Sequence, residues 1–153
     1  MMKIYGDAIM EQMAQIDMGW DREVDFVGEA HKMNMFSLAY AFTPDEARIL
    51  AEVGCPAISS HVGSTVGGMK GAKSGLTLEE ATQMSQEIFD AAKAVNPDVI
   101  LFAHGGPMKG AREAEYVVKH TDAVGFIGGS AAERMPIEKA VLAATEEYKA
   151  IML

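Results

Sequence analysis

The 153-residue sequence has little cysteine, a deficit of basic residues and no long apolar run. Its single cysteine, Cys55, excludes an internal disulfide, which is typical of proteins in a reducing cytoplasm. Because Cys55 lies between Gly54 and Pro56 and belongs to no CxxC motif, we interpret it as a small buried hydrophobic residue. No apolar run approaches the roughly 18 residues of a membrane span, and the first residues lack the basic and apolar regions of a signal peptide. We therefore expect a cytoplasmic protein with no membrane partner.

Acidic residues outnumber basic ones, with 22 Asp and Glu against 13 Lys and Arg and a net charge of -9. A nucleic-acid-binding protein needs a basic face, so this balance predicts no nucleic-acid partner. Pairs such as Glu79-Glu80 and Glu146-Glu147 lie in expected helices and are typical of a solvated helical surface. An anionic ligand would therefore have to be attracted locally, by backbone N–H groups and a few cations.

Short apolar segments alternate with longer amphipathic stretches, and the length predicts one domain over residues 1–153. We predict an N-terminal helical segment at residues 1–33 and strands at residues 36–41, 57–61, 99–103 and 123–127. Helices are expected at residues 21–33, 111–120 and 136–149. Two further helices begin with a capping box and end at a breaking residue: Thr43 with Glu46 to Gly54, and Thr77 with Glu80 to Asn96.

Strands that alternate with helices predict a parallel sheet with right-handed crossovers. Two α/β architectures fit: a small open sheet, or half of a (β/α)8 TIM barrel, whose full length is about 250 residues. We predict the half-barrel, with four parallel βα units.

A half-barrel leaves two open strand edges and an uncovered inner face, on which we place Ile58, Ile100, Phe102 and Phe126. The predicted partner is therefore a second copy, in a homodimer or higher homo-oligomer, or a separate N-terminal half-barrel chain. In the alternative, the apolar residues of the first 19 positions cover this face.

Glycine-rich loops follow three successive strands, at the end of a parallel α/β sheet where ligands bind. Glycine lets the backbone approach a ligand and offer N–H donors to an anion. The candidate ligand-binding residues are Gly63, Thr65, Gly67, Gly68, Gly105, Gly106, Gly128, Gly129, Ser130 and Arg134. We expect phosphate or sulfate to bind between the loop at residues 104–106 and the loop at residues 128–130, where the backbone donors of both loops should converge. Arg134 is also a candidate for a structural ion pair with Glu133 or Glu138.

Two histidines, His61 and His104, end strands directly before these loops and are the candidate catalytic acid–base residues. His31 and His120 lie within or at the end of helices and are interpreted as structural. No nearby carboxylate completes a zinc site with His61 and His104, so no metal is expected there. The sequence has no Walker lysine pattern, HExxH or GxSxG motif, so the reaction and any cofactor stay unknown.

Three segments resemble a known family. They are the His-Gly-Gly-Pro turn at residues 104–107, the loop that begins with His-Val-Gly-Ser-Thr at residue 61, and the Glu-Arg-Met-Pro run at residues 133–136. Together they resemble the phosphoenolpyruvate hydrolase-like TIM-barrel family, which is also described as indole-glycerol-phosphate-synthase-like. That family includes domains of plant virus-resistance proteins and barrels attached to bacterial transcription regulators. Two details depart from its pattern: Met135 replaces a leucine, and Ala131-Ala132 replaces a Ser-Met pair.

The resemblance covers nearly the whole chain and implies the C-terminal half of the barrel, without its first four strands. It implies a small-anion-binding protein, and a hydrolase or lyase that acts on a phosphorylated or carboxylated small molecule. Two alternatives stay open at this point. One is a non-catalytic ligand-sensing or regulatory module, and the other is a half-barrel remnant whose main property is oligomeric assembly.

Overall fold

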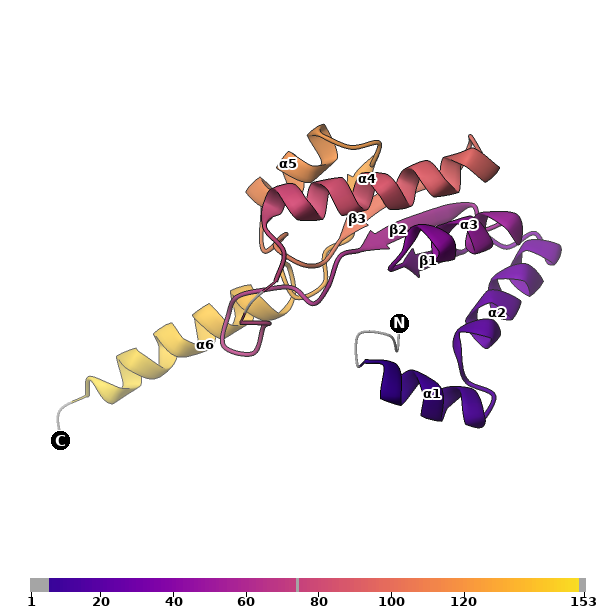
Figure 1. The fold of residues 1–153 in the computed structure, drawn as a ribbon. Helices are drawn as coiled ribbons and strands as arrows, with labels where there is room; N and C mark the ends of the chain where they lie inside the picture. The colour runs from indigo at the N-terminus through magenta and orange to yellow at the C-terminus, as the bar shows by residue number, and fades with distance from the viewer. Residues whose placement is uncertain (1–5, 74, 152–153) are drawn as a thin grey trace.

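Four short apolar segments form one parallel sheet, as the alternation in the sequence predicts (Figure 1). The computed structural model describes residues 6–73 and 75–151. Its strands lie in chain order: β1 (Leu38–Ala41), β2 (Ala57–His61), β3 (Ile100–His104) and β4 (Gly125–Phe126). Its helices are α1 (Asp7–Gln15), α2 (Trp20–Lys32), α3 (Pro44–Glu52), α4 (Leu78–Val95), α5 (Ala111–Lys119) and α6 (Arg134–Lys149). This confirms the predicted α/β class with four parallel strands, the arrangement of half a TIM barrel.

The two predicted capping boxes begin α3 and α4. The backbone N–H of Glu46 donates to Thr43 Oγ1 over 3.3 Å, which satisfies one of the free donors of α3. At α4 the exchange is reciprocal: Glu80 N–H donates to Thr77 Oγ1, and Thr77 N–H donates to the Glu80 carboxylate. The chain leaves α3 through Gly54, whose φ of 84° is a conformation that glycine adopts without strain. The reciprocal box at α4 and the end of α3 at Gly54 are therefore confirmed, whereas at α3 Thr43 caps the helix and the Glu46 carboxylate accepts from the N–H of Phe42.

Strand register decides which side chains enter the core. Residues paired across parallel strands point to the same face, and successive residues along one strand point to opposite faces. Ile58 is paired with Leu101 and is fully buried on the face covered by helices, together with Leu50, Ile88 and Phe89. Phe126 is paired with Ala103 and packs against the same core. Our placement of Ile58 and Phe126 on the uncovered face is therefore wrong, because each lies one residue out of phase with that face.

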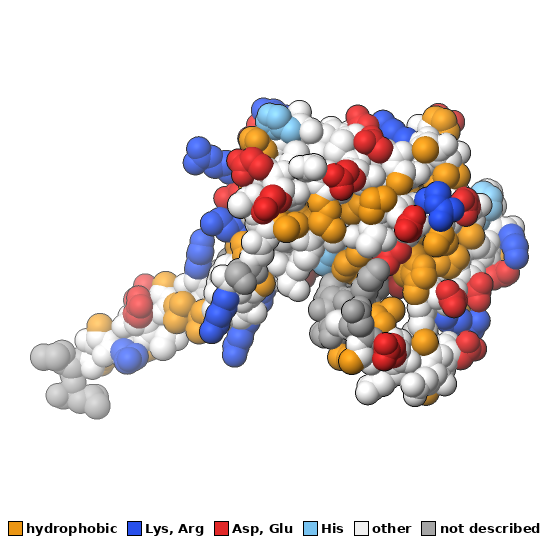
Figure 2. All heavy atoms as spheres, in the orientation of Figure 1, with side chains coloured by type: hydrophobic (Ala, Val, Ile, Leu, Met, Phe, Trp, Pro, Cys, Tyr) orange, Lys and Arg blue, Asp and Glu red, His pale blue; other side chains and the backbone are white. Residues whose placement is uncertain are grey.

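The opposite face of the sheet carries Ile100 and Phe102, as predicted, together with Leu38. Leu38 is 39% exposed and Ile100 is 38% exposed, so this face is only partly covered. Helix α6 leaves the end of β4, projects away from the sheet and has no buried residue (Figure 1). Hydrophobic side chains are visible along it in Figure 2. The exposed large apolar residues of α6 are Ile137, Val141, Leu142 and Tyr148.

Some element boundaries differ from the prediction. The N-terminal helical segment is divided into α1 and α2, with Asp17 at a φ of 60° between them, and residues 1–5 lie outside the described residues. The first strand begins at Leu38 instead of residue 36, because the chain turns through Asn34 at a φ of 56° after α2. The last strand has only two residues, and α6 begins two residues before the predicted start. None of the helices described here combines the length and the apolarity that crossing a membrane requires.

Candidate functional site

A cavity of about 340 Å³ opens at the C-terminal ends of the strands. We call it the histidine cavity, because the last residues of β2 and β3, His61 and His104, both line it. The strand register pairs these two histidines, so their rings lie side by side with centroids 4.8 Å apart. The full lining is Tyr40, His61, Gly63, Ser64, Thr65, His104, Gly129, Ser130 and Glu133.

Aromatic rings hold His61 from two sides. The Phe42 ring stacks on it at a centroid distance of 4.4 Å, and the Tyr40 ring meets it edge-on at 5.4 Å. Only 5% of His61 is exposed, and its Nδ1 accepts a hydrogen bond of 3.3 Å from the backbone N–H of Gly63. Burial, and then the charge of the neighbouring His104, lowers the pKa of His61 to about 4. His61 is therefore neutral at physiological pH.

His104 is held by a different partner. Its Nδ1 lies 2.7 Å from the carbonyl oxygen of Ile127, in the loop that follows β4. Its ring also lies beside Tyr40, with centroids 4.8 Å apart, and burial raises the pKa of the Tyr40 hydroxyl. The tyrosine is thus a neutral donor and acceptor at the edge of the histidine pair.

Of the predicted ligand-binding residues, Gly63, Thr65, Gly129 and Ser130 line the histidine cavity. The loop after β4 lies against His104, since a Cβ on Gly129 would be 3.7 Å from His104 Cε1. Within residues 6–73 and 75–151, the backbone N–H groups of Gly129 and Ser130 donate to no other group. Both of these donors belong to residues that line the histidine cavity.

Gly105 and Gly106 instead join two loops. The N–H of Gly106 donates to the carbonyl oxygen of Gly63 over 2.7 Å, and a Cβ on Gly105 would collide with that same oxygen. Both glycines have positive φ values, 86° and 54°. Gly128 packs against Phe126 and does not line the cavity.

Arg134 forms an ion pair of 2.7 Å with Glu138, one of the two partners considered from the sequence. It also donates to the carbonyl oxygen of Gly67 over 3.1 Å, so it fastens the glycine-rich loop that follows β2 to α6. Gly67 and Gly68 line a different cavity of about 520 Å³, between that loop and α6. The structure therefore brings Gly67, Gly68 and Arg134 together with each other, away from the lining of the histidine cavity.

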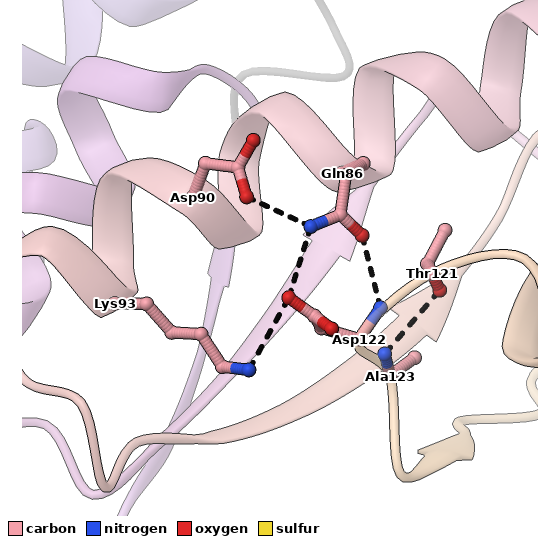
Figure 3. A network of polar contacts seen from close by, with 6 residues as sticks. All are labelled: Gln86, Asp90, Lys93, Thr121, Asp122 and Ala123. Atoms are coloured by element: carbon pink, nitrogen blue, oxygen red, sulfur yellow. Dashed lines mark hydrogen bonds and ion pairs between the residues drawn. The ribbon is translucent and has the colours of Figure 1, made fainter.

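A polar network holds the segment before β4 against α4 (Figure 3). Gln86 accepts a hydrogen bond of 2.9 Å from the backbone N–H of Asp122 and donates one of 3.0 Å to its carboxylate. Lys93 lies 3.2 Å from the same carboxylate, and the pKa of Asp122 is lowered by the bond from Gln86 and then by Lys93. These contacts fix the segment that leads into the two-residue strand β4.

Three lining residues were not predicted from the sequence: Tyr40, Ser64 and Glu133. Tyr40 is paired with Ser59, two residues before His61, and this two-residue spacing could have placed it on the histidine face. His31 and His120 do not line the histidine cavity, and the His120 ring stacks on Tyr116 at 4.2 Å. Among the described residues, no group of three or more His, Cys, Asp or Glu side chains is arranged to hold a metal ion.

Comparison with known proteins gives one family and several relatives. The model of a family described as phosphoenolpyruvate hydrolase-like matches residues 1–151. The ToMV susceptible protein tm-1(GCR26) of Solanum lycopersicum is 42% identical over 144 residues, which are 94% of this chain and 19% of that protein. The ToMV resistance protein Tm-1(GCR237) of the same species is 41% identical over the same shares. A protein of Sinorhizobium fredii named as a transcriptional regulatory protein, y4pA, is 32% identical over 88% of this chain and 22% of its own length. The chain thus spans about a fifth of each relative.

Proposed function

Because the chain belongs to the phosphoenolpyruvate hydrolase-like family, we propose that its histidine cavity binds a small phosphorylated or carboxylated molecule. The observation that supports this proposal is that a histidine pair and a glycine-containing loop lie next to each other at the C-terminal ends of the strands. A histidine pair with ring centroids 4.8 Å apart lies there, beside a loop whose Gly129 and Ser130 N–H groups have no partner among the described residues. Free N–H groups at such a loop favour an anionic oxygen.

Hydrolase or lyase chemistry in this cavity would use His61 and His104 as its acid–base residues. Each is an imidazole within reach of a ligand that occupies the cavity, and a positioned imidazole typically accelerates proton transfer by about 10²–10⁴-fold. Tyr40 is a further neutral donor next to both rings.

Thermal-shift and calorimetric titrations with phosphate, sulfate and phosphoenolpyruvate test the binding site. We expect at least one of these anions to raise the melting temperature. Gly129→Val should abolish that shift without unfolding the protein. The new side chain has room at its Cβ, 3.7 Å from His104 Cε1, and it adds two methyl groups at a residue that lines the cavity. Gly28→Ala is the matched control, since a Cβ at Gly28 meets only Val53, outside the cavity. If none of the three anions shifts the melting temperature, the proposal is wrong.

A second candidate function is a ligand-sensing module without catalysis. The relative from Sinorhizobium fredii, which is named as a transcriptional regulatory protein, favours it. The two candidates differ in turnover. An enzyme would convert a bound phosphoenolpyruvate-type substrate, as followed by NMR of the substrate, whereas a sensor would bind it unchanged.

We also propose that the chain associates with a second copy of itself. The partly exposed face with Leu38 and Ile100, the two strand edges and the bare helix α6 all offer apolar or unpaired surface. A second copy of this chain would cover this surface and continue the sheet toward a closed barrel. A separate N-terminal half-barrel chain is the other outcome of a test of assembly.

A further inference from the structure

We propose that the histidine cavity selects oxyanions that carry a proton, such as hydrogen phosphate or a singly protonated phosphate monoester, over fully deprotonated oxyanions such as sulfate. This inference rests on the proposed anion-binding function and specifies which anions the cavity accepts. It follows from the backbone partners of the two histidines and from the charges around them.

The partner of His104 fixes its tautomer. A carbonyl oxygen only accepts hydrogen bonds, so the 2.7 Å contact between His104 Nδ1 and the Ile127 oxygen requires the hydrogen on Nδ1. In the neutral ring Nε2 then has a lone pair and no hydrogen. Among the described residues, no group forms a hydrogen bond with this Nε2. Every fully buried side-chain nitrogen or oxygen in the same residues does have a hydrogen-bond partner. His104 Nε2 is therefore not fully buried, and in the neutral ring of this lining residue it is a hydrogen-bond acceptor.

The Gly63 contact of His61 favours the opposite tautomer. The N–H of Gly63 donates to His61 Nδ1 over 3.3 Å, and this bond places the hydrogen of the neutral ring on Nε2, in competition with a bond from the ring to the backbone of His61 itself. Burial keeps this ring neutral, since the pKa of His61 is lowered to about 4. By the same reasoning as for His104, His61 Nε2 is not fully buried, and with its hydrogen it is a donor on a residue that lines the cavity. The pair thus offers one acceptor and one donor to a ligand.

Among the remaining lining groups, the hydroxyls of Tyr40, Ser64, Thr65 and Ser130 can donate or accept, whereas Glu133 favours a ligand that brings its own hydrogen. Glu133 is the one charged side chain among the nine lining residues, which include no lysine or arginine. Its carboxylate, like His104 Nε2, accepts hydrogen bonds. Hydrogen phosphate can donate its proton to one of these acceptors, while its other oxygens accept from His61 Nε2–H and from the N–H groups of Gly129 and Ser130. Sulfate would leave an acceptor facing an anionic oxygen, which costs the energy of an unmade hydrogen bond.

Isothermal titration near pH 8 with phosphate and sulfate tests this selectivity. Both ions are dianions of similar size, but only phosphate keeps a proton at this pH. We expect the wild-type protein to bind phosphate at least about tenfold more tightly. His104→Ala should weaken phosphate binding and bring the two affinities together, whereas His61→Ala should weaken both by a similar factor. His120→Ala, which changes an exposed ring outside the cavity, is the control and should alter neither affinity.

The outcomes separate this inference from the proposed function. Equal affinities of the wild-type protein for the two ions would overturn the selectivity and leave anion binding intact. Binding of neither ion would overturn the selectivity, and if phosphoenolpyruvate also failed to bind, the proposed function would be overturned with it. Long-range ¹H–¹⁵N NMR of the histidine rings near pH 8 needs neither ligand nor variant. We expect Nδ1–H for His104 and Nε2–H for His61, and the same tautomer at both positions would overturn the structural basis of the proposal.

Discussion

A buried hydrogen bond between two serines holds β2, the strand that ends at His61, against α4. Ser60 Oγ donates to Ser85 Oγ over 2.9 Å, and both side chains are fully buried. Ser60→Ala removes one hydroxyl and leaves the other without this partner in a dry environment. We expect the free energy of unfolding to fall by about 1–3 kcal/mol, and Ser85→Ala to have a similar effect.

The double variant, with alanine at both positions, should be much less harmful than the sum of the single changes. No hydroxyl is then left unpaired, and alanine also has a higher helix propensity than serine by a few tenths of a kcal/mol. Urea unfolding followed by circular dichroism gives the three free energies, and their difference gives the coupling between the two serines. Strictly additive effects, or single variants as stable as wild type, would show that this hydrogen bond does not hold β2.

Three other properties are testable in the same way. Gly105→Ala places a Cβ against the Gly63 carbonyl oxygen, at a residue whose φ is 86°. We expect the free energy of unfolding in urea to fall by about 1–3 kcal/mol. An unchanged urea midpoint would contradict the contact between the two loops. Gln86 and then Lys93 lower the pKa of the Asp122 carboxyl in the folded protein from an ordinary 3.8. The ionised carboxylate therefore adds about 0.2–1 kcal/mol to the free energy of unfolding above pH 3.8. This stabilisation is lost as the pH falls through the lower pKa of the folded state. Asp122→Asn should flatten the acid end of a stability–pH curve, and an unaltered curve would argue against the network. Sedimentation velocity at micromolar concentration should show a species heavier than the 16.4 kDa chain, and a compact monomer would refute the proposed association.

Local signals in the sequence were sufficient to predict most of the fold. The capping box at Thr77 and the left-handed glycine at Gly54 act through neighbours within a few residues, so they can be read from the chain alone. The face of the sheet to which Ile58 points could not be predicted from such local signals. Its run of apolar and small residues has no alternation, and the register with β3 decides which of its neighbours enter the core.

The candidate site was predicted only in part, for the same reason. His61 and His104 end strands that the pattern placed side by side, and the structure pairs them. The roles of Gly105 and Arg134 depend on partners 42 and 67 residues away, the carbonyl oxygens of Gly63 and Gly67, which no local pattern reveals. Glycines in a loop therefore did not distinguish a ligand contact from a contact between two loops.

NMR titration of the ¹⁵N-labelled protein with phosphate near pH 8 tests the proposed binding site most directly. We expect saturable shifts of the backbone amides at residues 64–65 and 128–130, together with shifts of the His61 and His104 ring signals. These atoms line or adjoin the histidine cavity, and no other region should respond to the same extent. Shifts confined to other regions, such as the cavity between Gly68 and α6, or no shifts at millimolar phosphate, would contradict a binding site at the histidine pair.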